Sequence, residues 1–218
     1  MTGDLPDAAS GWPVTWRGVV ETLGSTFGPN GRWNIAPLGL RWGEPVTATT
    51  WGRTRTRRNL DRTASCVIQF PTDPVVFVDA ALSIVERDEP VVADAAAWVR
   101  VDAEAIETGT EHDTEWKRWE LTPVETEVIA PTVPTLSRAT GAVVEASVAA
   151  SRFDVTGYDD RHGYEIIAWA GTVVDRAGGP RERLAYERLV DHADLDRSEL
   201  DARRLAFESN PSEADPHE

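Results

Sequence analysis

One segment of the sequence concentrates the residue types that bind anions. From Trp51 to Arg62 the chain reads WGRTRTRRNLDR, which includes five arginines, two threonines and one asparagine. Guanidinium groups, hydroxyls and free backbone N–H groups near a helix start can hold a phosphate through charge-assisted hydrogen bonds. The segment therefore predicts a phosphate site on the turn Arg53–Asn59, which we expect to join two strands.

Two other interpretations of this arginine-rich segment stay open. A solvent-exposed turn could hold the same arginines in ion pairs with the abundant carboxylates. A nucleic-acid patch is the weaker alternative, because no second basic region supports it and the formal net charge of −15 repels polyanions. We therefore expect no nucleic-acid partner.

The charge balance also bears on the conditions in which the protein works. Asp and Glu number 37 against 22 Lys and Arg, and Lys117 is the single lysine. An acidic surface with almost no lysine is typical of adaptation to high salt, because carboxylates hold water while salt screens their mutual repulsion. An acidic protein from a GC-rich genome, which favours arginine codons, is the alternative.

A second candidate segment is Trp33–Leu40, which reads WNIAPLGL. Proline is excluded from hydrogen-bonded positions of central strands, so Pro37 predicts a strand edge or an interrupted ladder that leaves backbone groups free for a ligand. A plain β-bulge is the simpler alternative. Trp33, Trp42 and Trp51 flank the two segments and could stack on a flat ligand or belong to the core.

Other chemistries find no support in the sequence. The four histidines have no metal-ligand spacing, and no G-x-S-x-G, H-E-x-x-H or P-loop motif is present, so we expect no metal site and assign no catalytic residue. Cys66, the single cysteine, lies in an apolar strand and is expected to be buried and inert. No apolar run reaches the roughly 18 residues of a spanning helix, so we expect no membrane segment and a cytoplasmic location.

The remaining pattern defines the elements that must position these residues. Alternating or apolar runs predict strands at Arg17–Thr26, Trp33–Trp42, Val46–Trp51 and Cys66–Phe70, and a hairpin of Trp98–Glu107 and Trp116–Val128 around Gly109. Thr72 or Asp73 can cap a helix at Thr72–Leu82, and Pro74 fits its first turn. Helical spacing predicts further helices at Ser137–Arg152, Tyr164–Val174 and Arg183–Val190. The fold class predicted is mainly β with a helical extension (α+β), with the strands in a closed or partly open barrel.

We divide the chain accordingly into four parts. Residues 1–12 are expected to be a mobile tail, 13–130 the barrel domain, 131–208 the helical C-terminal part, and 209–218 an acidic tail.

Five motifs in order carry a resemblance to a known family. They are Glu21-Thr22, the Asn-Ile-Ala-Pro-Leu-Gly run from Asn34, Arg-Thr-x-x-Asn-Leu at Arg55–Leu60, the strand Ser65–Phe70, and Thr72-Asp73-Pro74. Together with Ser137–Arg152 they resemble the archaeal and bacterial family known as domain of unknown function 447. That family lies within the FMN-binding split-barrel superfamily, which includes the flavin reductases.

The resemblance implies a split β-barrel, a homodimer and bound FMN. Thr56 and Asn59 match the phosphate turn of the related reductases, and the strand at Asn34 matches the one that runs beside the flavin ring. Gln69 stands where many relatives have asparagine. The cofactor-binding residues expected on this basis are Asn34, Ala36, Pro37, Leu38, Arg53, Thr54, Arg55, Thr56, Asn59 and Gln69.

The leading functional hypothesis is an FMN-binding flavoprotein, with the flavin carrying out oxidoreductase chemistry. NAD(P)H or another electron donor would then be a partner. A flavin-binding module without turnover, such as a carrier or sensor, is the first alternative. A nucleotide- or RNA-binding barrel that uses Arg53–Arg62 is the second.

Overall fold

The computed structural model describes residues 11–14, 16–111, 113–131, 136–153, 155 and 157–209. The chain divides into two compact units. Unit 1 comprises Met1–Thr72 and Ile84–Val133, and unit 2 comprises Asp73–Ser83 and Pro134–Glu218. Residues 1–10 and 210–218, which include most of the two expected tails, lie outside the described residues.

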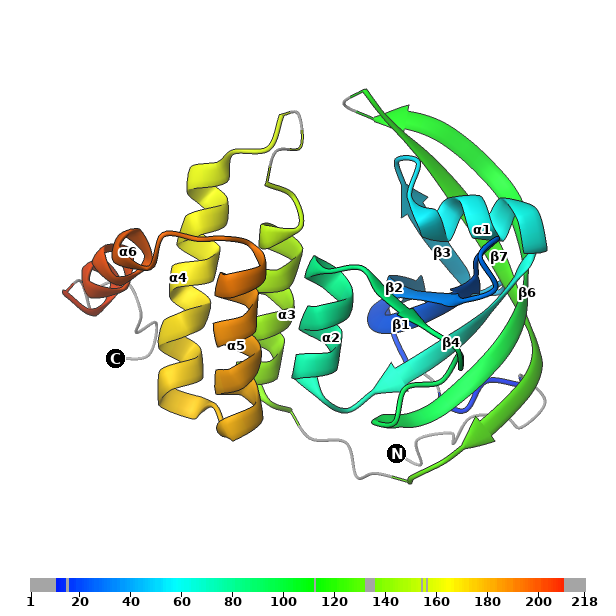
Figure 1. Cartoon of the computed structure of the whole chain (residues 1–218), viewed down its shortest axis with the longest axis horizontal. Coiled ribbons are helices and arrows are strands. Elements are labelled where there is room, and N and C mark those ends of the chain that lie inside the picture. The colour runs from blue at the N-terminus through cyan, green and yellow to red at the C-terminus, as the bar shows by residue number, and fades with distance from the viewer. Residues whose placement is uncertain are drawn as a thin grey trace. The chain divides into compact units, whose positions relative to one another are not determined.

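Unit 1 is an antiparallel β-barrel (Figure 1). Its strands neighbour one another in the order β1-β4-β6-β7-β3-β2, a further β1–β2 pairing closes the ring, and β5 adds to β2. The predicted α+β class, a barrel with a helical extension, is confirmed. The strands are β1 Val19–Phe27, β2 Trp33–Arg41, β3 Thr47–Trp51, β4 Ser65–Pro71, β5 Val85–Arg87, β6 Ala95–Glu111 and β7 Thr114–Val128.

Strand β2 has an interrupted edge, as Pro37 predicted. It pairs with β1 along its whole length, from Phe27↔Trp33 to Val19↔Arg41. On its other side it pairs with β5 only at Trp33–Ile35 and with β3 only at Leu40–Arg41. Residues 36–39 therefore have no strand partner on that side among the described residues, which fits a proline that cannot donate to a ladder.

The hairpin of β6 and β7 is longer than predicted, and its turn lies elsewhere. Glu111 pairs with Thr114, so the pairing of the two strands continues past Gly109, where we predicted the turn. Gly109 lies within the strand opposite Trp116, and a Cβ there would come within 2.5 Å of the Trp116 ring. Gly109 therefore serves the close approach of an indole ring to the backbone and not the predicted turn.

The predicted turn Arg53–Asn59 is wrong: most of it belongs to helix α1, Arg55–Thr63. The sequence shows no apolar repeat at helical spacing here, because Leu60 is the only apolar residue between Arg55 and Thr63. Strand β5 and helix α6, Arg197–Ser209, were not predicted either. Three residues of β5 are too few to show an alternation, and charged residues dominate α6.

The barrel core forms one apolar cluster with α1 attached to it. Leu60 of α1 packs among strand residues that include Leu40, Ile68 and Val101. Trp12, inside the range expected to be a tail, is buried in the same cluster. Cys66 is buried here as predicted, and burial raises the pKa of its thiol to about 12, so the thiol stays protonated and unreactive.

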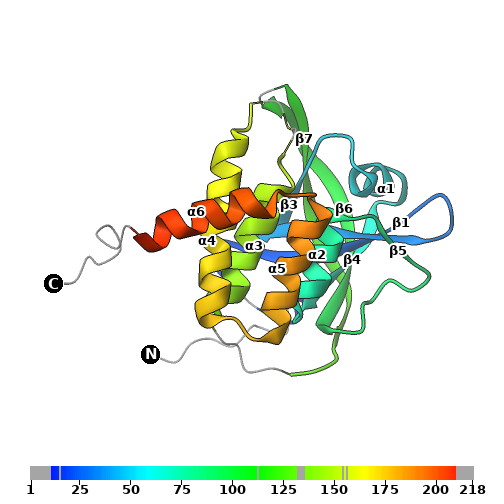
Figure 2. The same ribbon diagram turned by 60° about the vertical axis from the view of Figure 1, so that its left-hand side comes forward.

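Unit 2 is a bundle of helices with an alanine-rich core. Four of its helices lie side by side, and α6 lies against α4 on the outer side of the bundle (Figure 1 and Figure 2). The predicted face of α3, with Ala142, Val143 and Ala146, is buried as expected. No described helix is long and apolar enough to cross a membrane. The four helices are α2 Pro74–Leu82, α3 Arg138–Ala150, α4 Asp160–Ala177 and α5 Pro180–His192.

Helix α2 joins this bundle although the sequence places it between two strands of the barrel. Asp73, its N-cap, pairs with Arg181 of α5. Asp79 pairs with Arg188 and, at 3.0 Å, with His192. Burial by itself would raise the pKa of Asp79, but its hydrogen bonds and electrostatic contacts with Arg188 and His192 lower that pKa below its ordinary value. The predicted cap and first-turn proline of this helix are confirmed.

Candidate functional site

Helix α1 is the element that positions the candidate site. Thr54 is its N-cap: the extended backbone of Thr54 brings its hydroxyl to accept from the Arg57 N–H at 3.3 Å. The helix ends where Ala64 adopts a left-handed conformation and its N–H donates to the Leu60 carbonyl at 2.9 Å. Its bounds are thus set by local hydrogen bonds at both ends.

The buried side of α1 joins three of the predicted binding residues to the barrel. Asn34 Nδ2, from β2, donates to Thr56 Oγ1 at 3.4 Å. Asn59 Nδ2 donates to Thr26 Oγ1 at 3.1 Å and to the Thr26 carbonyl at 3.4 Å. All these polar side chains are buried, and Leu60 anchors the helix beside them. The amides and hydroxyls that the sequence singled out therefore hold α1 against β1 and β2.

A cavity of about 350 Å³ lies next to this network; we call it the basic cavity. The spacing of Arg55, Arg58 and Arg62 places all three on one side of the helix, facing this cavity. Arg58 donates to the Arg53 carbonyl at 3.2 Å, and Arg62 donates to the Phe27 carbonyl. The lining consists of Gly28, Pro29, Asn30, Asn34, Arg55, Arg58, Asn59, Arg62 and Glu86.

Glu86 is the single carboxylate in that lining. It lies on β5, opposite Asn34 in the β2–β5 pairing. Its Oε1 lies 2.6 Å from Arg55 Nη1, and its Oε2 accepts from Asn30 Nδ2 at 3.2 Å. The cavity thus carries three guanidinium groups and one carboxylate, and positive charge dominates.

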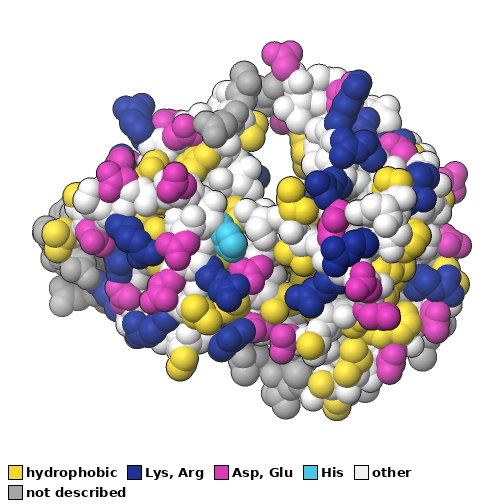
Figure 3. Space-filling view, in the orientation of Figure 1, with side chains coloured by type: hydrophobic (Ala, Val, Ile, Leu, Met, Phe, Trp, Pro, Cys, Tyr) yellow, Lys and Arg dark blue, Asp and Glu magenta, His cyan; other side chains and the backbone are white. Residues whose placement is uncertain are grey.

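The other predicted arginine lies outside this cavity. Arg53, strongly exposed, lies 3.5 Å from Glu115 of β7. Arg57, which belongs to the same predicted turn, lies 3.4 Å from the same carboxylate and donates to the Gly52 carbonyl. Both arginines therefore pair with a carboxylate, as the alternative of surface ion pairs expected, although only Arg53 is exposed and the Arg57 side chain is 15% exposed. In the space-filling view, basic side chains lie over the part of unit 1 that carries α1, with carboxylates among them (Figure 3).

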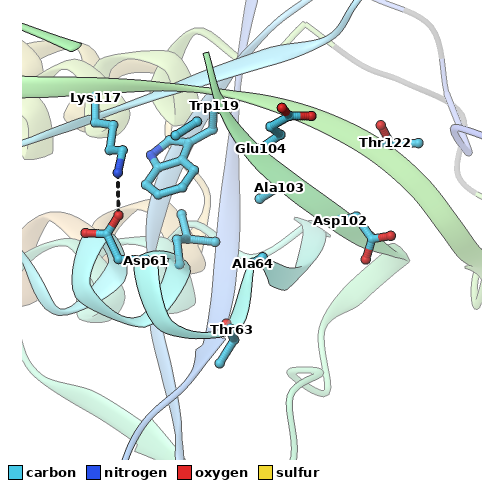
Figure 4. A pocket seen from close by; sticks show the side chains of 11 residues that line it. Asp61, Thr63, Ala64, Asp102, Ala103, Glu104, Lys117, Trp119 and Thr122 are labelled. Atoms are coloured by element: carbon cyan, nitrogen blue, oxygen red, sulfur yellow. Dashed lines mark hydrogen bonds and ion pairs between the residues drawn. The ribbon is translucent and has the colours of Figure 1, made fainter. Parts of the chain in front are cut away.

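A second, wider cavity of about 730 Å³ borders α1; we call it the acidic cavity. Asp61 of α1 and Asp102 and Glu104 of β6 line it, together with Lys117 of β7 (Figure 4). Lys117 pairs with Asp61 and lies 4.7 Å from the centre of the Trp119 ring. Three carboxylates against one amine make this cavity unsuited to a phosphate.

Comparison with known families decides the classification of the chain. The model of the N-terminal domain of the protein family of unknown function DUF447 matches residues 20–130, and the model of the C-terminal part matches residues 137–191. The chain belongs to the DUF447 family. The resemblance inferred from the five motifs is therefore confirmed. A search of the curated proteins finds no match.

One solved structure in the comparison shares the fold of this DUF447 chain. The chain is similar to the FMN-bound DUF447 protein MM1853 from Methanosarcina mazei, with a TM-score of 0.70 and 23% identity over 85% of this chain and 98% of that one. Weaker likenesses are to a putative flavin reductase from Shewanella frigidimarina (TM-score 0.38, 17% identity, 53% and 69% covered) and to flavoredoxin from Methanosarcina acetivorans (0.35, 13%, 50% and 67%). The predicted split barrel is confirmed.

The remaining predicted residues of the DUF447 chain lie away from the basic cavity lining. Gln69 is fully buried, where its Nε2 donates to Ser25 Oγ at 2.6 Å and to the Pro90 carbonyl at 2.8 Å, and its Oε1 accepts from Val92 N–H at 2.6 Å. Its carboxamide thus fastens β4 to β1 and to the chain before β6. Ala36, Pro37 and Leu38 lie on the interrupted edge of β2, with Leu38 packed in the core.

Sequence reasoning missed six lining residues of the basic cavity in this DUF447 chain, four of which have polar or charged side chains. Arg58 and Arg62 complete the guanidinium set, and Asn30 and Glu86 come from the β1–β2 turn and from β5. The spacing of the arginines would have revealed their common face once the segment was known to be helical. No local signal connects Glu86 to Arg55, because 31 residues separate them.

Proposed function

We propose that this DUF447 chain binds FMN in unit 1, with the phosphate held in the basic cavity. The observation that carries the proposal is the convergence of Arg55, Arg58 and Arg62 on one small cavity in a chain of net charge −15. A phosphate monoester is close to doubly charged at neutral pH and is recognised by guanidinium donors. An FMN-bound relative in the same family supports the choice of ligand.

The residues present fit the phosphate end of this cofactor. The cavity volume of about 350 Å³ lies at the small end of the range for ligand sites. Three guanidinium groups supply charge, and the Asn34 and Asn59 carboxamides add polar groups at its wall. The chain thus offers donors where an anionic ligand needs them, between elements fixed by buried hydrogen bonds.

We place the flavin ring along β2 beyond the cavity. Asn34 lines the cavity and lies two residues before Ala36 on the same strand. The interrupted edge at residues 36–39 leaves backbone groups that no described strand pairs with. Backbone donors and acceptors of this kind can orient a ring edge. Gln69 would support the site through β1 rather than by touching the cofactor.

FMN supplies hydride- or electron-transfer chemistry when it is bound. On that basis we propose an FMN-dependent oxidoreductase, with NAD(P)H as the first electron donor to test. The chain's own contribution is to bind the phosphate, to orient the ring and to hold α1 in place. A flavin carrier or sensor is the alternative, and it shares the same site.

Binding of FMN and riboflavin tests the proposal directly. We expect the purified chain to bind FMN more tightly than riboflavin, which lacks the phosphate. Arg58→Ala should weaken FMN binding roughly ten- to a hundredfold, because it removes one charged hydrogen bond to the phosphate. Riboflavin binding should stay nearly unchanged. Equal losses of affinity for both flavins would mean that Arg58 contacts the flavin ring or stabilises the fold instead of binding the phosphate. Absence of flavin binding would remove the proposal.

Arg100→Ala is the matched control for that substitution. Arg100 is an exposed arginine on β6 that pairs with Glu125 at 3.2 Å and lines neither cavity. Arg100→Ala changes the net charge by the same amount as Arg58→Ala. It should nevertheless leave the FMN affinity within about twofold of the original protein, because salt screens distant charges. Anaerobic bleaching of bound flavin by NADH or NADPH would then distinguish an enzyme from a carrier.

We further propose a homodimer. Unit 1 exposes large apolar side chains, among them Val19, Trp51 and Ile106, each about half exposed. Covering such side chains is a common basis for association. Light scattering in molar salt should give twice the chain mass, and a monomer mass with flavin bound would contradict the dimer.

We also propose that the protein is adapted to high salt and works in the cytoplasm. The Debye length grows from about 3 Å at 1 M salt to about 30 Å at 0.01 M, so the repulsion among the excess carboxylates strengthens as salt is removed. The melting temperature should therefore fall between molar and millimolar potassium chloride. A flat profile would remove the high-salt adaptation.

A further inference from the structure

One carboxylate is built into the wall of the basic cavity. Glu86 occupies two of the groups that an incoming anion would use, Arg55 at 2.6 Å and Asn30 at 3.2 Å. Its side chain is three-quarters buried, at 24% exposure, and pairing of β5 with β2 fixes its backbone. The negative charge is therefore held in place by the sheet.

Arg55 differs in this respect from the two other arginines of the cavity. Arg58 donates to the Arg53 carbonyl and Arg62 to the Phe27 carbonyl, whereas Arg55 is paired with a carboxylate. A phosphate can approach Arg58 and Arg62 without displacing an anion. To bind Arg55, the phosphate must either displace Glu86 from it or bind with the Glu86 carboxylate still within a few ångströms, where the two negative charges repel each other.

We propose that Glu86 is a resident competitor of the ligand phosphate, and that Arg55 exchanges Glu86 for the phosphate when FMN binds. This inference rests on the proposed function, because it concerns the same cavity. Without ligand, Glu86 offsets the mutual repulsion of three neighbouring guanidinium groups. With ligand, its competition for Arg55 weakens phosphate binding, so Glu86 sets the affinity and favours release of FMN.

Glu86→Gln tests the proposal with little change of shape. The amide oxygen can still accept from Asn30, but it no longer carries charge. We expect the FMN affinity to rise about five- to tenfold, mainly through slower dissociation, and the riboflavin affinity to stay within about twofold. Unchanged or weaker FMN binding would overturn the proposal, as would an equal gain for both flavins.

Glu125→Gln is the matched control. Glu125 lies on β7 and pairs with Arg100, so the variant also removes one carboxylate from an arginine pair and raises the net charge equally. Its FMN affinity should stay within about twofold of the original protein. A gain equal to that of Glu86→Gln would reveal a long-range charge effect and contradict a competitor inside the cavity.

A double-mutant cycle tests whether Glu86 acts through Arg55. In an Arg55→Ala background, Glu86→Gln should raise the FMN affinity less than about twofold, because the one guanidinium for which Glu86 and the phosphate compete is absent. A full gain in that background would overturn the exchange. Glu86→Ala serves as a second variant if the glutamine variant folds poorly, with the same outcomes.

The outcomes separate this inference from the proposed function. If the original protein binds neither flavin, the proposed function is wrong and the inference falls with it. If the original protein binds FMN and prefers it to riboflavin, while Glu86→Gln gains nothing, only the role of Glu86 is overturned.

Discussion

The two cavities of unit 1 are lined by different sides of one nine-residue helix, yet their charges are opposite. Arg55, Arg58 and Arg62 face the basic cavity, while Leu60 and Asp61 face the acidic one. With 3.6 residues per turn, steps of three and four stay on one side of a helix. The charge of a whole chain therefore says little about a single site. A strongly acidic protein can still present a local surface that attracts a phosphate.

The two cavities also differ in how their charges are neutralised. In the acidic cavity the single amine, Lys117, is paired with Asp61, and carboxylates remain in excess. In the basic cavity the single carboxylate, Glu86, is paired with Arg55, and guanidinium groups remain in excess. Size alone would favour the wider acidic cavity as a ligand site. The excess of guanidinium groups favours the smaller basic cavity as the site for an anion.

The largest effect, a loss of stability, should come from truncating Leu60, which packs α1 against the barrel core; α1 lines both cavities. Leu60 is 1% exposed and packs in the barrel core, so Leu60→Ala should lower the free energy of unfolding by about 2–5 kcal/mol. Urea denaturation followed by tryptophan fluorescence measures this loss. Leu136→Ala, at a leucine whose side chain is fully exposed, should change stability by less than about 0.5 kcal/mol. Equal effects would contradict the anchoring role.

Charge reversal on either side of α1 tests the functional difference between the cavities. Arg62→Glu and Lys117→Glu make the same change in net charge, one in the basic and one in the acidic cavity. We expect Arg62→Glu to weaken FMN binding about a hundredfold or more, since it replaces a donor by a repelling charge. Lys117→Glu should alter it less than about threefold.

Titration of both variants with FMN and riboflavin in the same buffer measures this difference. Circular dichroism checks that each variant is folded. Similar FMN losses in the two variants would mean that the overall charge, and not the basic cavity, governs binding. A loss confined to Lys117→Glu would move the phosphate to the acidic cavity.

A smaller effect is expected at the start of α1. Thr54→Ala removes the hydroxyl that caps the Arg57 N–H and should cost about 1 kcal/mol of stability. FMN binding should weaken only a few fold, because Arg55 and Arg58 lie in the first turns that would fray. Thr54→Ser keeps a capping hydroxyl, so its free energy of unfolding, measured by denaturation, and its FMN affinity, measured by titration, should both match those of the original protein. Failure of serine to do so would contradict the capping role.

The strands and the helices with clear periodicity were predictable from the sequence. The cap at Asp73 with Pro74 behind it defined α2, and the small apolar residues of α3 defined its buried face. Pro37 correctly marked an interrupted ladder in β2. These features depend on residues a few positions apart, and local conformational preferences decide them.

The sequence by itself thus determined the kind of fold, the family motifs and the segment in which basic charge is concentrated. The tertiary structure alone decided which arginines share a cavity. Arg58 and Arg62 joined Arg55 because the segment is helical, and it is helical because Leu60 could be buried in the barrel core. Glu86 reached Arg55 because β5 pairs with β2 in a register that places it opposite Asn34. Such contacts depend on closure of the barrel and on strand register, which no short stretch of sequence encodes.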